Sequence, residues 1–171
     1  MTDAERPPKK WLFAAIAVRI VVFFFLAPGN NDDHGDVIRR LVQYGRMPTL
    51  WETQQAQHAP LYYLMAAPFW KLTGDFKAVQ MLSLLFSIGT LLVLYHLIYQ
   101  TPLIPNRRAR TSGFLMVSLL PQFVMFSLYV SNDTAAIFLG NLAILQAWRY
   151  IQSPDRRQLI LLGAVTALGL L

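Results

Sequence analysis

The chain has 171 residues and a formal net charge of +6; charged residues make up 14% of it and hydrophobic residues 55%. Soluble domains carry about a quarter charged residues, so this composition excludes an ordinary soluble protein and predicts an integral membrane protein. The sequence contains no cysteine, which excludes a disulfide framework and a thiolate metal site within it.

Long hydrophobic stretches predict an all-α polytopic membrane protein. A helix needs roughly 20 apolar residues to cross a hydrocarbon core of about 30 Å. Four stretches reach or approach that length, and a fifth stops with the sequence after roughly 20 Å of helix. We therefore expect the N-terminal part of one transmembrane domain, with spans at residues 11–27, 79–98, 111–130 and 134–150 and a truncated span at 159–171.

The distribution of charge across these spans predicts their orientation. Most basic residues lie before the first span, between the second and third, and between the fourth and fifth, whereas six of the nine acidic residues lie in the other connections. By the positive-inside rule, this pattern places the N-terminus in the cytoplasm of a multi-pass protein of the cell membrane. Because the charges are sorted by membrane side, the pI near 9.9 does not indicate nucleic-acid binding.

The outer connection at residues 29–77 is too long for a simple turn. Residues 36–44 place apolar side chains on one helical face and basic ones on the other, which predicts an amphipathic helix lying flat in the membrane interface. Residues 60–72 are apolar and aromatic, but they are too few to span the bilayer and they contain Pro68. We interpret them as an interfacial or re-entrant segment.

An acidic cluster with the sequence DDHGD, residues 32–36, follows the first span directly. One of its carboxylates could act as the general base for an incoming hydroxyl, or two could hold a divalent cation against a phosphate leaving group. The alternative is structural: Asp36 caps the amphipathic helix while Asp32 and Asp33 are simply solvated.

A second acid, Asp133, lies at the tip of the predicted hairpin between the third and fourth spans. This tip faces the same outer side as the acidic cluster, so the two regions could share one site. The alternative is that Ser131, Asn132 and Asp133 serve only as N-cap residues of the fourth span.

Arg19 lies near the middle of the first span, where a charge costs roughly 2.5 to 3.5 kcal/mol. It should therefore face a bundle interior, a cavity or an acidic partner, either to bind phosphate or to make a structural contact. In the third span, Pro121 predicts a kink, and Gln122 beside it is expected to satisfy the backbone groups that the kink frees.

Four features, taken together, resemble the start of the GT-C superfamily of polyprenyl-phosphate-sugar-dependent glycosyltransferases, which includes the dolichyl-phosphate-mannose protein mannosyltransferases. They occur in order over roughly residues 10–150: DDHGD, then YGRMP, then HAPLYYLMAAPFW, and finally LLPQFVMFSLYVSNDTAAIFLG. The chain departs from the family in one place, since it has APLYY where PPLYY is usual.

The resemblance implies inverting transfer of a sugar from a lipid-linked donor, a polyprenyl phosphate, to an unknown acceptor on the non-cytoplasmic face. It makes Asp36 or Asp33 the position that matches the family's base, with Asp36 preferred, and it makes Asp133 the matching acid of the fourth span. Members of the family usually have many more spans, so the 171 residues given are not expected to be active alone. The candidate substrate-binding residues are Arg39 and Arg40, which could neutralise the leaving phosphate, together with His58, Tyr62, Asn132 and Arg19.

Cofactors and other functions stay open at this point. No cofactor is certain, and Asp33, Asp36 and Asp133 are the candidate ligands of a divalent metal. The expected partners are the lipid-linked sugar donor and membrane lipids, with no nucleic acid. The alternatives to a glycosyltransferase are a transporter or channel subunit, in which Arg19 and the outer acids line a polar pathway, and a non-catalytic membrane assembly protein.

Overall fold

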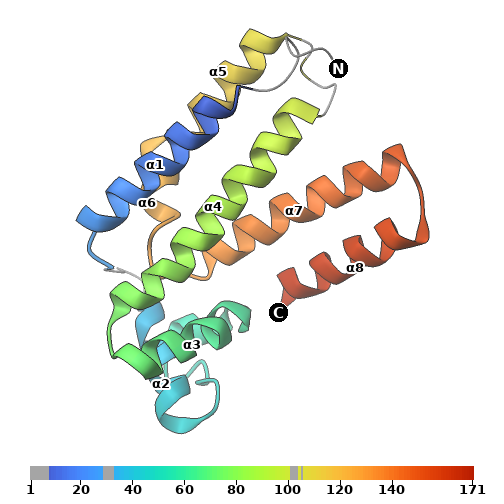
Figure 1. The fold of residues 1–171 in the computed structure, drawn as a ribbon. Coiled ribbons are helices and arrows are strands. Elements are labelled where there is room, and N and C mark those ends of the chain that lie inside the picture. The colour runs from blue at the N-terminus through green and yellow to red at the C-terminus, as the bar shows by residue number, and fades with distance from the viewer. Residues whose placement is uncertain (1–7, 29–32, 101–103, 105) are drawn as a thin grey trace.

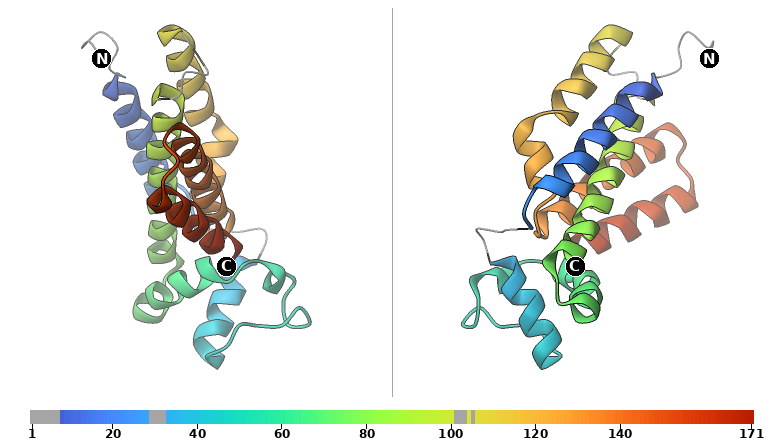
Figure 2. Two further views of the ribbon diagram at one scale, coloured as in Figure 1. Left: turned by 90° about the vertical axis from the view of Figure 1, so that its right-hand side faces the viewer. Right: turned by 60° about the vertical axis from the view of Figure 1, so that its left-hand side comes forward.

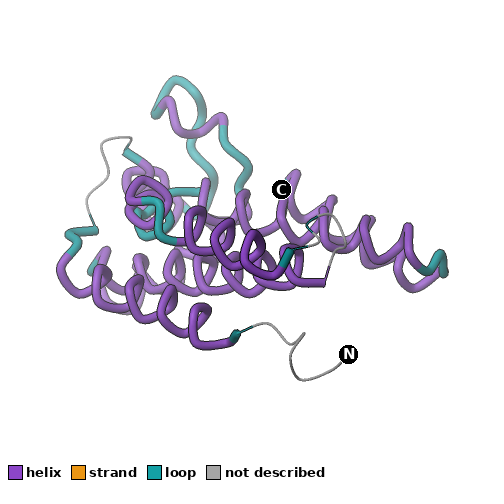
Figure 3. Tube along the Cα trace, turned by 90° about the horizontal axis from the view of Figure 1, so that it is seen from above, coloured by secondary structure: helices purple, strands orange, loops and turns teal. Residues whose placement is uncertain are grey.

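The computed structural model of the chain describes residues 8–28, 33–100, 104 and 106–171, and helices account for most of these ranges. Seen from above in Figure 3, helices joined by loops make up the described residues, and no strand occurs among them. The helices are α1 (Lys9–Phe25), α2 (His34–Tyr44), the short 3₁₀ helix η2 (Gln54–Gln57), α3 (Leu61–Thr73), α4 (Phe76–Gln100), α5 (Arg107–Ser118), α6 (Pro121–Phe126), α7 (Asp133–Gln152) and α8 (Arg156–Leu170).

The all-helical part of the fold prediction is confirmed. Among the described helices, one segment within α4, residues 76–99, is long and apolar enough by itself to cross a membrane. A multi-pass arrangement with a cytoplasmic N-terminus therefore stays a prediction.

Helix α4 is the centre of the arrangement, because α1, α3, α5 and α7 all contact it. In Figure 1, α1 and α4 run antiparallel, α7 diverges from α4, and α8 returns beside α7. Helices α2 and α3 lie at the end of the bundle opposite the N-terminus, as the turned views in Figure 2 also show. The turn between α6 and α7 reaches this same end.

Two apolar clusters hold the helices together at opposite ends of α4. One joins α1, α4 and α5, and its buried residues are Leu12, Ala15, Leu91, Tyr95, Tyr99 and Phe114. The other joins α2, α3, α4 and the start of α7, and its buried residues are Val37, Ile38, Tyr62, Tyr63, Ala66, Val79, Leu82, Val130 and Ala135. The second cluster forms the base of the candidate functional site.

The predicted third span, residues 111–130, is interrupted by a break and does not form one kinked helix. Helix α5 ends at Ser118 and α6 begins at Pro121, with Leu120 in a non-helical conformation at a ψ of 121°. Proline has no N–H to donate and disfavours helical geometry in the residue before it, so the helix stops there. The predicted single span is therefore two short helices, and α6 ends again at Phe126.

Residues 36–44 are helical as predicted, but two details of this segment differ from the expectation. Helix α2 begins at His34, so Asp36 lies inside its first turn and is not the N-cap residue. Its apolar side chains Val37 and Ile38 are fully buried against α3 and α4, so protein rather than lipid covers that face. Helix α3 runs across the axis of α4 (Figure 1), as a segment in the interface would, but the membrane position of both helices stays a prediction.

Close contact between α4 and α7 gives the first testable prediction. A Cβ atom added at Gly89 would lie 2.7 Å from Cε2 of the Phe138 ring, whereas one added at Gly140 would meet nothing within 4 Å. We expect Gly89→Val to unfold more easily than Gly140→Val by about 1–3 kcal/mol, because only the first variant overpacks the helix pair. Thermal unfolding in detergent measures the difference, and equal stability of the two variants would contradict the packing described.

Candidate functional site

The side chain of His34 connects three segments that are far apart in the sequence. It lies at the start of α2 and is almost fully buried. Its Nδ1 atom is 2.7 Å from the hydroxyl of Tyr63 in α3, and its Nε2 atom is 3.3 Å from the hydroxyl of Ser131 in the turn before α7. The ring centroid of His58 lies 5.4 Å from that of His34. The acidic segment and the tip of the hairpin therefore meet through one imidazole ring.

The hairpin tip places Asp133 beside this histidine contact. The backbone N–H of Asp133 donates to the hydroxyl of Ser131, at 3.2 Å, so Ser131 caps the first turn of α7 while it contacts His34. Ser131 thus lies one residue before the N-cap position, so the N-cap interpretation is not confirmed for it, although its hydroxyl accepts from the first residue of the helix. At the N-cap position itself, Asn132 makes no capping bond with its side chain.

Tyr62 and Tyr63 form the wall between α3 and the hairpin tip. The Tyr62 hydroxyl is 2.8 Å from the hydroxyl of Ser83 in α4. Burial raises the pKa of both phenols, and the nearby carboxylate of Asp133 raises the pKa of Tyr63 further. Both tyrosines are therefore protonated at neutral pH and can act as hydrogen-bond donors.

Asn132 and Tyr62, two of the predicted substrate-binding residues, also line a small cavity between α3, α7 and α8. Its volume is about 20 Å³, which is room for about one water molecule. The Oδ1 atom of Asn132 is buried and has no hydrogen-bond partner among the described residues. This part of the site thus has an unused acceptor but no space for a sugar.

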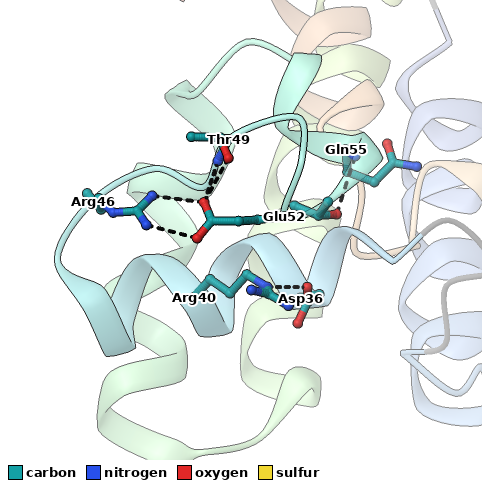
Figure 4. A network of polar contacts seen from close by, with 7 residues as sticks. Asp36, Arg40, Arg46, Thr49, Glu52 and Gln55 are labelled. Atoms are coloured by element: carbon teal, nitrogen blue, oxygen red, sulfur yellow. Dashed lines mark hydrogen bonds and ion pairs between the residues drawn. The ribbon is translucent and has the colours of Figure 1, made fainter.

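The two acids of the first cluster that the structure describes have different surroundings. Asp36 is half-buried, and its Oδ2 atom accepts from Nε of Arg40 at 2.6 Å, as Figure 4 shows. Asp33 is exposed and adopts a left-handed conformation at a φ of 59°, which asparagine and aspartate tolerate better than most residues. Arg39 is exposed and lies over the ring of Phe76, 5.3 Å from its centroid. Asp32 lies outside the described residues.

The loop after α2 is fastened by a second ion pair (Figure 4). Glu52 accepts from both terminal nitrogens of Arg46, at 2.9 and 2.8 Å, and from the backbone N–H of Thr49 at 2.7 Å. Gly45, whose φ of 67° suits glycine, ends α2 and turns the chain into this loop. The loop holds Trp51 almost fully exposed.

Arg19 does not belong to this group of residues. Its side chain is completely buried among α1, α4, α5 and α6, where Nε and Nη1 donate to protein oxygen atoms. It faces the interior of the bundle, one of the environments expected for a charge in the first span, and no carboxylate is among its bonded partners.

The predicted metal ligands do not gather in the described part of the chain. No group of three histidine, aspartate or glutamate side chains there is arranged to hold a metal ion. We therefore derive no step of the chemistry through a metal bound by Asp33, Asp36 and Asp133.

Sequence reasoning missed the roles of His34, Tyr63 and Ser131. The sequence DDHGD assigns no function to His34, because a histidine beside acids is not specific by itself. Its burial depends on contacts with residues 29 and 97 positions away in the sequence, which no local pattern reveals.

The structure thus brings the turn that carries Asp33 and Asp36 to the hairpin tip that carries Asp133, through the contact of His34 with Ser131 at one end of a helical bundle. A comparison with protein families identifies the group directly. Residues 57–171 match the family described as dolichyl-phosphate-mannose-protein mannosyltransferase, and the chain belongs to this family. The resemblance found in the sequence is confirmed at the level of the family, which comprises mannosyltransferase-type glycosyltransferases.

The matched residues include HAPLYYLMAAPFW and the whole hairpin, but not DDHGD or YGRMP. Tyr63 and Ser131 both lie within the matched part, so the contact of His34 with them is one of the interactions that join the acidic turn to it. Searches of curated proteins and of solved structures give no significant match.

The ion pair of Glu52 gives a prediction about pH. Arg46 and Thr49 lower the pKa of Glu52 from 4.5 to about 2, so the carboxylate stabilises the loop above pH 4.5 and loses this effect as the pH falls toward 2. We expect the fluorescence of Trp51, with the other three tryptophans replaced by phenylalanine, to stay constant down to about pH 5 and then to change. Glu52→Gln should show the loosened loop at every pH, and a transition that persists in this variant would contradict the assignment.

The contact between His34 and Ser131 predicts an energetic coupling. In a double-mutant cycle of His34→Ala and Ser131→Ala, we expect the two effects on unfolding free energy to differ from additivity by about 0.5–3 kcal/mol. The control cycle pairs His34→Ala with Thr166→Ala, whose hydroxyl bonds within α8, and it should be additive within about 0.5 kcal/mol. Additivity in both cycles would show that the side chains of His34 and Ser131 do not interact.

Proposed function

We propose that this chain is part of a glycosyltransferase that moves a sugar from a polyprenyl-phosphate donor to an acceptor hydroxyl on the non-cytoplasmic face of the cell membrane. Membership of the mannosyltransferase family supports the reaction class. The observation that carries the proposal is the contact of His34 with Tyr63 and Ser131, because it brings the first turn of α2 to the tip of the hairpin.

In this proposal the acceptor oxygen attacks the anomeric carbon of the sugar while the bond from that carbon to the phosphate oxygen breaks. The acceptor proton passes to Asp36, and the polyprenyl phosphate leaves with the bonding electrons. Arg40 holds Oδ2 of Asp36, so the other carboxylate oxygen takes the proton. Asp33 is the alternative base, because its side chain is exposed and it immediately precedes α2.

The remaining predicted residues have supporting roles in the proposal. Arg39 on the exposed face of α2 and Arg40 beside Asp36 offer positive charge to the leaving phosphate. Asp133 and His58 form the opposite wall, where they orient the sugar or the acceptor. Tyr62 is buried with its hydroxyl on Ser83, so it supports this wall from the interior instead of touching the substrate. Lipid contact along the helices lets the donor present its sugar at the membrane surface.

The proposal predicts that the native protein, purified in detergent, consumes a polyprenyl-phosphate-mannose donor and releases polyprenyl phosphate. We expect Asp36→Asn to lower the turnover number by roughly 10²- to 10⁴-fold, because the general base is lost. Asp155→Asn is the matched control: Asp155 caps α8 through Oδ1, asparagine can accept the same bond, and activity should not change. The turnover numbers of Asp33→Asn and Asp133→Asn, measured in the same assay, rank the three acids by their contribution to catalysis.

Unchanged turnover in Asp36→Asn would remove Asp36 from the base position. Solute flux across proteoliposomes without donor consumption would instead favour the transporter alternative and contradict the glycosyltransferase.

A further inference from the structure

The buried guanidinium of Arg19 contacts both sides of the break between α5 and α6. Its Nη1 atom donates to the carbonyl of Ser118 at 2.8 Å, and its Nε atom donates to the hydroxyl of Ser87 at 2.7 Å. Its charged centre lies 5.0 Å from the ring centroid of Phe123. The three partners lie on α5, α4 and α6.

The contact with Ser118 satisfies a group that the break itself frees. Ser118 is the last residue of α5, and in a continuous helix its carbonyl would accept from the N–H of Gln122. The chain leaves the helix at Leu119, so that partner is lost, and an unpaired carbonyl within the bundle would be costly. A charged donor from α1 replaces it.

The contact with Ser87 extends to the far end of α6. The Ser87 hydroxyl donates to that of Ser127 at 2.9 Å, and Ser127 is the C-cap residue of α6. The C-terminal end of α6 is thereby connected to α4 and Arg19, while Phe123 connects its middle. Arg19 therefore acts on the start, the middle and the end of the region between α5 and the hairpin tip.

Ser131 follows Ser127 by four residues. Its hydroxyl contacts His34 and accepts from the backbone N–H of Asp133, the first residue of α7. We propose that Arg19 is a positioning residue: it holds the end of α5 and the helix α6 in place on the two sides of the break, and so sets the place of the hairpin tip against α2. The kinetic part of this inference rests on the proposed glycosyltransferase function. The conformational part stands without it.

This role differs from phosphate binding by Arg19, which the sequence left open. The side chain is completely buried, and only its Nη2 atom lacks a partner among the described residues. A residue that positions the site changes the turnover number when it is replaced, whereas a residue that binds the donor phosphate changes the Michaelis constant for the donor.

The first test measures the conformation directly. The 171 residues contain no cysteine, so Ser87→Cys with Ser127→Cys introduces one pair whose side-chain oxygens now lie 2.9 Å apart, a separation that a disulfide can bridge after a small shift. In native membranes we expect this pair to cross-link under mild oxidant and Arg19→Met to slow the cross-linking severalfold. Arg149→Met, at an exposed position late in α7, is the matched control and should have no effect.

The second test measures turnover in the native protein with a polyprenyl-phosphate-mannose donor. We expect Arg19→Met to lower kcat by up to about 100-fold with little change in the donor KM, because a shift of about 1 Å in the catalytic groups is enough for such a loss. Arg19→Lys, which keeps the charge and one donor group, should recover part of both the cross-linking rate and kcat.

The inference would be overturned if the cysteine pair cross-linked as fast with Arg19→Met as without it. It would also be overturned if Arg19→Met raised the donor KM and left kcat unchanged. If the unaltered protein shows no transferase activity, the proposed function fails, but the cross-linking measurement still decides whether Arg19 holds the break.

Discussion

The contact of a buried histidine with two hydroxyl groups is the constraint on which the candidate site depends. His34 cannot reach Tyr63 and Ser131 together unless α2, α3 and the turn before α7 pack at one end of the bundle. The apolar cluster beneath it, with Val37, Ile38 and Val130 among its members, supplies the burial energy that holds these segments together. The hydrogen bonds then fix how the segments are placed, because a buried polar group is costly when it is left unpaired.

The same principle explains the region around Arg19. A proline ends a helix inside an apolar bundle, and the carbonyl that loses its partner is satisfied by an arginine from another helix. The positive charge near the middle of the first predicted span and the proline in the third are therefore parts of one arrangement. Two features that look unfavourable when each is taken alone compensate each other in the fold.

Much of the fold could be predicted from the sequence, because apolar length and helical periodicity are local properties. Residues 11–27, 79–98 and 134–150 all lie within or almost within helices, as their hydrophobic length indicates. The break at Pro121 was underestimated as a kink, since the compensating contact with Arg19 comes from about 100 residues away. The apolar face of α2 was assigned to lipid because a single amphipathic pattern cannot distinguish lipid from the facing tyrosines of α3.

The roles of the candidate site residues stay predictions, although the sequence does point to part of the region that the structure brings together. The acidic turn and Asp133 were recognised as candidates from residue type and membrane side, and the family match supports the reaction class. The pairing of Asp36 with Arg40 follows helical spacing and could have been read from the sequence. The histidine that joins the two turns could not, because its partners are defined only by the tertiary packing.

The central claim is that the start of α2 and the tip of the hairpin touch at one end of the helical bundle. It is tested most directly by cross-linking Asp33→Cys to Asp133→Cys, two exposed positions that flank the contact of His34 with Ser131, with a short dimaleimide in native membranes. Asn106→Cys with Asp133→Cys is the control pair. Asn106 lies just before α5, at the opposite end of the bundle from the hairpin tip. The account predicts efficient cross-linking of the first pair and none of the second. Failure of the first pair in protein that remains folded and reacts with monofunctional maleimide at both positions would contradict it.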